Sequence, residues 1–253
     1  MAEQVPKSQN VDSSQKRLPE SGLSFSVASS LNEIIAAWRL VYQRYVGNGL
    51  ICPNPYGLHT VEQTIYSDTS VVVGALDDQV VSTLTIMHDN DGLPLDSVYG
   101  NELNALRDEG RQLLEVGLLA DRRDKMSRCI SAIFQLIRFP YFNAKLSGRD
   151  MLAGVHPHHA GFYQRTIGFE PWGPAKEYPR VNRQPVVLLR VNIDEVLTRK
   201  KLPKATAMFE ANPLPTDAFD QRYSLNHNRI SGTPIGAYLS QYVGERPTPH
   251  SAA

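Results

Sequence analysis

Residues 70–87 constrain the fold of this 253-residue chain most strongly, because they have the pattern of two β-strands joined by a tight turn. The stretches SVVVGAL (70–76) and VVSTLTIM (80–87) are rich in valine and threonine, which favour extended backbone. Asp77-Asp78-Gln79 between them has the composition of a turn. The sequence therefore predicts an antiparallel hairpin in this part of the chain.

Strand and helix patterns alternate around this hairpin. Before it, residues 23–27 (LSFSV) predict a short strand, and Ser30 with Glu33 forms a capping-box pattern at the start of a helix. We expect that helix to stop at Gly47-Asn48-Gly49. After the hairpin we expect a helix capped by Asp96 and stopped by Gly110, a strand over 111–120, and a long helix from Asp124 that Pro140 kinks or ends. The last predicted elements are a strand over 151–155, a helix that begins at Pro157 and holds Phe162 and Tyr163, and a strand over 185–193. Mixed strands with helices on both faces predict an α/β or α+β domain of three layers.

The two ends of the chain differ from the core in composition. Residues 1–22 are polar and have no apolar h-region, so we expect a disordered leader and no secretory signal. Residues 195–253 are rich in proline, and we expect a C-terminal extension packed against a domain of residues 23–194. No run approaches the roughly 18 apolar residues that a membrane-spanning helix needs.

Composition narrows the partners and the compartment. The 26 Lys and Arg residues balance the 26 Asp and Glu residues, so charge gives no reason to expect a nucleic acid or an anionic membrane as partner. Two cysteines, Cys52 and Cys129, are too few for a disulfide framework or a cysteine-rich zinc site. We interpret both as buried or partly buried thiols, and we expect a cytoplasmic protein.

Two long segments resemble a known family. DNDGLPLDSVYGNELNALRDEGRQLLEVGLLA is one, and VHPHHAGFYQRTIGF with the later YPRVNRQPVVLLRV is the other. They are similar to the N-acyl amino acid synthases of the FeeM type, a branch of the GNAT acyltransferases that is related to the acyl-homoserine lactone synthases. The resemblance covers roughly residues 23–194 and leaves out both ends.

The resemblance implies a GNAT fold, with a mixed central sheet flanked by helices on both faces. It also implies an N-acyltransferase that moves a long acyl chain from an acyl carrier protein to the amine of an amino acid or similar small molecule. The donor is then an acyl-phosphopantetheine thioester, on a carrier protein in preference to coenzyme A. We expect no metal and no tightly bound cofactor, and a homodimer stays open.

Glu115 is the first candidate catalytic residue. It lies in the apolar strand LLEVGLLA, where the two-residue period places Leu113, Glu115, Gly117 and Leu119 on one face. A carboxylate among apolar neighbours is costly unless it is paired or functional. In the resembling synthases a strand glutamate at this motif is proposed to deprotonate the acceptor amine. The other interpretations are an ion pair with a nearby arginine and an edge position that faces solvent.

The strand after Glu115 is also expected to act through its backbone. N–H groups of this strand, at Val116 and Leu118, are candidates for polarising the thioester carbonyl. The lactone synthases continue the glutamate motif with a Ser-Arg pair, whereas Gly117-Leu118 stand here. This departure argues against a homoserine lactone product.

The segment 121–127 bears on the identity of the donor. Coenzyme A-using GNAT enzymes have a glycine-containing loop here, whose backbone N–H groups approach the pyrophosphate. This segment has no glycine, and phosphopantetheine on a carrier protein has one phosphodiester and no pyrophosphate. Arg122 and Arg123 are candidates for binding that phosphate or an acidic carrier surface. The simpler interpretation of either arginine is a solvated helix start.

Tyr163 is the second candidate catalytic residue. In many GNAT enzymes the pattern is Tyr-x-x-x-Gly-Phe, and its tyrosine protonates the leaving thiolate, whereas here four residues separate Tyr163 from Gly168. One extra residue turns a side chain by about 100° on an ideal helix. We therefore interpret Tyr163 first as a core tyrosine and second as a proton donor.

The first predicted helix carries further candidates. Arg39 resembles a first-helix arginine of the family and could bind the carboxylate of an amino acid, although a surface arginine is the simpler interpretation. The aromatic residues Trp38, Tyr42, Tyr45 and Tyr66 could wall an acyl tunnel, and ordinary core packing explains them equally well.

Three histidines follow the strand over residues 151–155. For His156, His158 and His159 a strand-end turn is preferred to a metal site, because no carboxylate or cysteine cluster stands nearby. His156 is the best placed of them to line the acceptor pocket, at the open end of the sheet where GNAT enzymes thread the thioester arm.

Two other functions stay open from the sequence. One is a GNAT N-acetyltransferase that uses acetyl-CoA. The other is a GNAT-like module that binds an acyl thioester or lipid without turnover.

Overall fold

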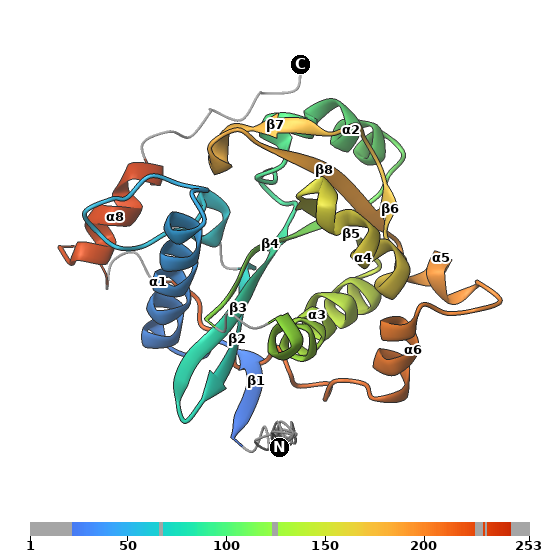
Figure 1. Cartoon of the computed structure of the whole chain (residues 1–253), viewed down its shortest axis with the longest axis horizontal. Coiled ribbons are helices and arrows are strands. Elements are labelled where there is room, and N and C mark those ends of the chain that lie inside the picture. The colour runs from blue at the N-terminus through green and yellow to red at the C-terminus, as the bar shows by residue number, and fades with distance from the viewer. Residues whose placement is uncertain (1–21, 66–67, 123–125, 226–229, 231, 244–253) are drawn as a thin grey trace, which may run out of the picture.

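A computed structural model describes residues 22–65, 68–122, 126–225, 230 and 232–243, and one mixed sheet organises them (Figure 1). Its main path has the order β1-β2-β3-β4-β5-β8-β6, and β7 pairs with β8. Neighbouring strands are antiparallel except for β4 and β5, which are parallel. The strands are β1 Leu23–Val27, β2 Ser70–Leu76, β3 Gln79–His88, β4 Leu113–Asp121, β5 Asp150–Val155, β6 Glu170–Pro171, β7 Lys176–Tyr178 and β8 Gln184–Val191.

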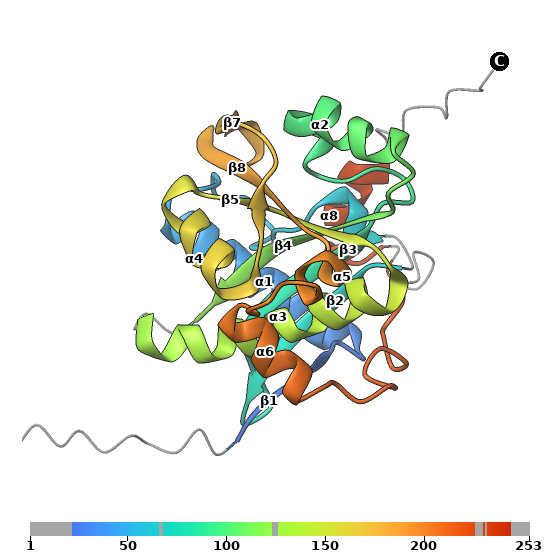
Figure 2. The ribbon, with the colours of Figure 1, turned by 90° about the vertical axis from the view of Figure 1, so that its right-hand side faces the viewer.

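Helices cover both faces of this sheet. The α-helices are α1 Leu31–Gly47, α2 Asp96–Asp108, α3 Met126–Ser147, α4 Pro157–Ile167, α5 Ile193–Leu197, α6 Lys204–Ala211 and α8 Pro234–Val243, with 3-10 turns η1 Glu62–Ile65 and η2 Pro179–Val181. Helix α1 packs on β3 and β4 from one face, and α3 packs on β2, β3 and β5 from the other (Figures 1 and 2). The predicted three-layer mixed fold is confirmed.

The predicted elements of the first half form for the expected local reasons. The Ser30 hydroxyl accepts the Glu33 N–H at 3.3 Å, and the Glu33 carboxylate accepts the Ser30 N–H at 3.1 Å, which completes the capping box. The hairpin turns at Asp77 and Asp78, whose φ values of 49° and 60° match the right-handed twist of the two strands. Gln79 already belongs to the second strand.

Two predicted details are wrong, and a third is wrong in part. Asp96 is the first residue of α2 and does not cap it, because its carboxylate turns back to accept the Leu93 N–H at 2.7 Å and to pair with Arg107. Of the two outcomes predicted for Pro140, the end is wrong, because α3 continues to Ser147, and the kink stays a prediction. The last strand ends at Val191, since the Asn192 side chain accepts the N–H of Glu195 and so caps α5.

Cys52 is exposed, so the prediction that it is a buried or partly buried thiol is wrong. The side chain of Cys129 lies outside the described residues, as does Asp124, the predicted start of the long helix. Among the residues that are described, none of the helices combines the length and the apolar character that crossing a bilayer requires.

The sheet is split between β4 and β5. These strands pair only over Leu113–Glu115 with Asp150–Leu152, although both continue beyond. Opposite Thr83 and Thr85 of β3, strand β4 carries one residue too many, a β-bulge at which Leu118 has a φ of 51°.

The bulge changes which residues of β4 share a face. Leu113 and Leu118 join the cluster on the side of α1 and α2, whereas Leu119 packs with Leu114 against α3. The predicted common face of Leu113, Glu115, Gly117 and Leu119 is therefore wrong at Leu119.

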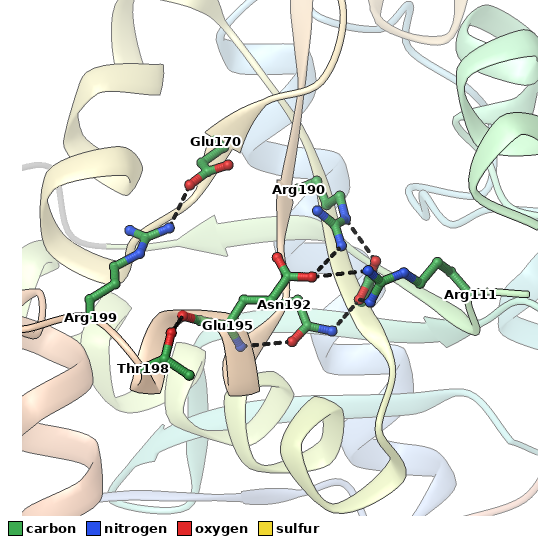
Figure 3. A network of polar contacts seen from close by, with 8 residues as sticks. Arg111, Glu170, Arg190, Asn192, Glu195, Thr198 and Arg199 are labelled. Carbon is green, nitrogen blue, oxygen red and sulfur yellow. Dashed lines mark hydrogen bonds and ion pairs between the residues drawn. The ribbon is translucent and has the colours of Figure 1, made fainter. Parts of the chain in front are cut away.

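A buried ion pair lies at the end of β5 that still pairs with β4, and it belongs to a network of polar contacts that includes Arg190, Asn192 and Glu195 (Figure 3). Asp150 of β5 is 1% exposed, and its carboxylate accepts from Arg190 Nε of β8 at 2.7 Å and from Asn192 at 2.6 Å. Arg190 and Arg111 both donate to Glu195 in α5. The network thus ties α5 to the sheet, and the boundary predicted at residue 194 falls inside this helix.

The residues after α5 pack on the core at two places. Helix α6 lies beside α4 (Figures 1 and 2), where the Thr206 hydroxyl donates to the Ile167 carbonyl at 2.8 Å and Phe209 is fully buried. On the other face, the Tyr238 hydroxyl of α8 accepts the Thr60 N–H at 2.9 Å. Treating residues 195–253 as a unit separate from the domain stays a proposal.

We predict that Arg190→Met lowers the free energy of unfolding by about 3–5 kcal/mol, because it leaves the Asp150 carboxylate buried without its guanidinium. The control is Arg199→Met, which removes an exposed pair with Glu170 in the same region (Figure 3) and should cost at most about 1 kcal/mol. Urea unfolding measures both, and equal effects would contradict the structural role of the buried pair.

Candidate active site

Two adjoining cavities lie where β4 and β5 separate. The larger cavity has a volume of about 340 Å³ and the smaller cavity about 100 Å³. Both are lined by Tyr45 of α1, by Val116, Gly117 and Leu118 of β4, and by Gly154 of β5. Because they share these residues, we treat them as two parts of one site.

The larger cavity is walled mainly by apolar side chains of β4, β5 and α3. Its polar side chains, besides Tyr45, are His156, His159 and Tyr163, from the start and the body of α4. Its volume lies within the range of about 300–1,000 Å³ that is common for small-molecule sites. The remaining lining residues are Leu50, Leu84, Leu119, Ile137, Met151, Ala153, Val155 and Phe169.

The smaller cavity contains Glu115, which is only 5% exposed. One carboxylate oxygen accepts the backbone N–H of Leu95 at 3.0 Å. Within the part of the chain that the structure describes, Glu115 forms no ion pair, and β4 lies inside the sheet. The interpretation of Glu115 as a solvent-facing edge residue is therefore wrong, and the ion-pair interpretation has no partner among the described residues.

Burial changes the acidity of Glu115. Loss of solvent raises its pKa to about 8, against the opposing effects of the Leu95 N–H and of the positive charge of Arg180. A carboxyl group with this pKa exchanges a proton near neutral pH, where an ordinary glutamate is fully ionised. Glu115 is thus suited to accept a proton from a bound ligand.

Comparisons with known proteins identify the family. The family model described as N-acyl amino acid synthase FeeM matches residues 36–192, more than half of the chain. The chain belongs to the FeeM family of N-acyl amino acid synthases. It is accordingly an N-acyltransferase with a GNAT fold. A comparison with curated protein sequences gave no match.

Solved structures agree on the fold of this FeeM-family protein. FeeM itself, from uncultured soil microbes, is 24% identical with a TM-score of 0.61, and the match covers 68% of this chain and 91% of that one. TofI, in a ternary complex with an inhibitor and MTA, is 14% identical with a TM-score of 0.53, over 68% and 91% of the two chains. MesI, a CoA-dependent acyl-homoserine lactone synthase, is 13% identical with a TM-score of 0.50, over 74% and 91%.

The FeeM-family fold brings five of the predicted site residues together. Glu115 lies in the smaller cavity, His156 and Tyr163 lie in the larger one, and Val116 and Leu118 line both. His156 also caps α4, with its Nδ1 accepting the His158 N–H at 3.2 Å. Within the described residues, no group of three or more His, Cys, Asp or Glu side chains is arranged to hold a metal.

Of the three predicted arginines, the two that the structure describes line neither cavity. Arg39 is exposed on α1 and is not among the residues that line either cavity. Arg122 follows β4, is exposed, and donates to Gln79 at 3.5 Å. Arg123 lies outside the described residues. Of the predicted aromatic wall, Tyr45 lines both cavities, whereas Trp38 is buried in the core, and Tyr66 is not described.

Sequence reasoning missed three polar residues of the smaller cavity. These are His59 in the loop after α1, Tyr178 at the end of β7, and Arg180 in the turn η2 that follows. The segment YPRVNR that contains two of them carries part of the family resemblance, which was the available signal. Burial lowers the pKa of His59 to about 4, so its ring is neutral at physiological pH.

A larger depression, of about 570 Å³, lies elsewhere on the surface. Asp89, Arg107, Arg111 and Arg149 line it with other polar residues near the start of β4. Its lining includes neither Glu115 nor any other predicted site residue. Two of its charged side chains are already paired, because Arg107 forms ion pairs with Asp89 and with Asp96.

We predict that Glu115→Gln stabilises the protein increasingly as pH rises. The folded carboxyl has a pKa of about 8 and the unfolded one an ordinary value, so between these values the folded state binds more protons. The stability contributed by Glu115 therefore falls with rising pH, by at most about 1.4 kcal/mol per unit. The Gln amide keeps an acceptor for the Leu95 N–H and has no charge to bury.

Urea unfolding of both proteins at several pH values between 5 and 8 measures this difference. The advantage of Glu115→Gln should grow across the series, and Glu109→Gln, which alters an exposed carboxylate after α2, should show no such growth. A constant difference for Glu115→Gln would contradict the raised pKa.

Proposed function

We propose that this N-acyltransferase moves a long acyl chain from an acyl carrier protein thioester to the amine of an amino acid or similar small molecule, with Glu115 as the base. The observation that carries the proposal is a buried, unpaired carboxyl group, among the described residues, beside an apolar cavity in an open split of the sheet. The apolar cavity suits an acyl chain and the carboxyl group suits an amine.

The chemistry requires a base because the acceptor amine is an ammonium near neutral pH and has no free electron pair. Glu115 takes one proton from the ammonium, and the nitrogen then attacks the thioester carbonyl carbon. The C–N bond then forms and the C–S bond breaks. The leaving thiolate takes up a proton from a donor in the site, and the nitrogen loses a second proton, which restores that donor. The products are an amide, a thiol and one proton released to solvent.

The backbone of β4 supports the developing negative charge in this proposal. Pairing of β4 with β5 ends at Glu115 and Leu152, so the edge of β4 at Val116 and Leu118 faces the cavities where another strand would otherwise lie. The bulge at Leu118 turns the backbone further out of the regular ladder. N–H groups here are candidates for polarising the thioester carbonyl.

Tyr163 is the proposed proton donor to the leaving thiolate. It lines the larger cavity, and burial raises its pKa to about 12, which keeps the hydroxyl protonated at neutral pH. Its aromatic contacts with Phe162 and Phe169 hold the ring. The same contacts also fit a core tyrosine, and a Tyr163→Phe variant with full turnover would leave it only that role.

The carrier-protein donor is the finer part of the proposal. It is supported by the absence of glycine in the segment 121–127, which gives a pyrophosphate no close backbone approach. Arg122, exposed just after β4, is available to a phosphodiester or to an acidic carrier surface. Cytoplasmic location and a homodimer stay predictions from the sequence.

A comparison of three acyl donors tests this function. The purified protein is incubated with the twenty amino acids and, in separate reactions, with palmitoyl acyl carrier protein, palmitoyl-CoA or acetyl-CoA, and products are identified by mass spectrometry. We expect N-palmitoyl amino acids from the carrier-protein donor. Product from palmitoyl-CoA alone would contradict the carrier donor, and acetylated product alone would contradict the long-chain function.

We predict that Glu115→Gln lowers kcat/KM by about 10²–10⁴-fold, the range of general base catalysis. The ratio of wild-type to variant kcat/KM should rise about tenfold per pH unit below about 8 and level off above it, because Glu115 must be ionised to act. Ionisation of the acceptor amine cancels in this ratio. Initial rates between pH 6 and pH 9 measure it, and a ratio independent of pH would remove Glu115 as the base.

A further inference from the structure

The smaller cavity offers two opposite charges to one ligand. Glu115 lies in its wall, and Arg180 is the one Lys or Arg among the described residues that line either cavity. The two groups are close enough for the charge of Arg180 to act on the Glu115 carboxyl. An α-amino acid has the complementary arrangement, since its ammonium and carboxylate are attached to the same carbon atom.

The backbone holds Arg180 in a fixed place. It lies in the middle of η2, whose turn closes through a bond from the Arg183 N–H to the Tyr178 carbonyl at 3.0 Å. The Asn182 side chain donates to the Gly49 carbonyl at 2.8 Å, which ties this turn to the end of α1. The Tyr178 hydroxyl donates to the Pro94 carbonyl at 3.2 Å, beside the Leu95 N–H that binds Glu115.

The guanidinium of Arg180 is available. In the described part of the chain it makes no hydrogen bond or ion pair, and its residue is exposed. Arg183 on the same turn differs, because it lies 3.8 Å from the Glu177 carboxylate and outside both cavities. A free guanidinium beside a cavity is suited to bind a carboxylate through two parallel N–H donors.

The sizes of the two cavities separate the two substrates. The larger cavity has room for an apolar chain, whereas the smaller one, of about 100 Å³, has room only for a small group. Neutral His59 and Tyr178 add polar side chains to its wall without adding a charge to those of Glu115 and Arg180. The smaller cavity therefore suits the ammonium and carboxylate of an acceptor, whose nitrogen then faces the shared wall at Gly117 and Leu118.

We propose that Arg180 binds the α-carboxylate of the acceptor and that the enzyme thereby selects amino acids over amines that lack this group. The inference rests on the proposed N-acyl transfer to an amino acid. It replaces Arg39, which lies outside the cavities, as the carboxylate-binding arginine. The amino group is then held with its nitrogen toward Glu115, so that selection and deprotonation use one binding mode.

The test compares each amino acid with its own carboxamide as acceptor, which keeps the amine and side chain and removes the negative charge. The wild type is first given all twenty amino acids and their carboxamides with palmitoyl acyl carrier protein, and the fastest amino acid is chosen with its amide. Wild type, Arg180→Met, Arg180→Lys and the control Arg183→Met are then compared by initial rates.

We expect the wild type to prefer the amino acid by about 10- to 100-fold in kcat/KM, the effect of one charge-assisted hydrogen-bonded contact. Arg180→Met should raise KM for the amino acid relative to the carboxamide by a similar factor and so abolish the preference. Loss of the guanidinium also changes the pKa of Glu115, but this affects both acceptors alike and cancels in the ratio. Arg180→Lys should restore part of the preference, since lysine has the charge without the paired donors. Arg183→Met should behave as the wild type.

Two outcomes would overturn the inference. One is a wild type that uses the carboxamide as well as the amino acid. The other is an Arg180→Met variant that loses both acceptors equally, which would indicate a structural role for the arginine. Failure of the proposed function is distinguishable, because then the wild type acylates neither acceptor.

Discussion

Separation of β4 from β5 after Glu115 is the constraint on which the site depends. Two parallel strands that pair over three residues and then diverge leave backbone and side chains that a continuous sheet would cover. The apolar cavity fills the opened space, and the carboxyl of Glu115 lies where pairing stops. The ion pair of Asp150 with Arg190 joins β5 to β8 at the end where β4 and β5 still pair.

Burial without a cation partner within the described residues gives Glu115 its chemical character. A buried charge is stabilised by pairing or becomes neutral by a shift of its pKa. Among the described residues, one backbone N–H reaches this carboxyl, and the guanidinium of Arg180 in the cavity acts from a distance. The protein therefore carries a group that gains and loses a proton near neutral pH, at a cost in stability that a glutamine would avoid.

The sequence predicted the elements well because their signals are local. The capping box at Ser30, the turn at Asp77-Asp78 and the proline at the start of α4 each depend on a few neighbouring residues. The details that failed depend on distant contacts. Asp96 does not cap α2 because Arg107 draws its carboxylate away, and Leu119 changes face because one extra residue enters β4 opposite β3.

The site could be predicted only in part for the same reason. Glu115 could be predicted because a charged residue within an apolar strand is recognisable from the sequence alone, and the structure shows that this carboxylate is buried. Arg180 has no such signal, since an arginine after a proline is ordinary until the turn brings it to the cavity. Arg39 is the opposite case, because the family resemblance suggested it as a site residue, whereas the fold places it at the surface.

The most direct test of this account is a titration of the Glu115 carboxyl itself. Infrared difference spectra between wild type and Glu115→Gln, recorded from pH 4 to pH 10, isolate the C=O band of the protonated acid. The account predicts that this band persists at pH 6 and disappears with a midpoint near 8. Loss of the band by pH 5, as for an ordinary glutamate, would show that Glu115 is ionised throughout and would contradict the account.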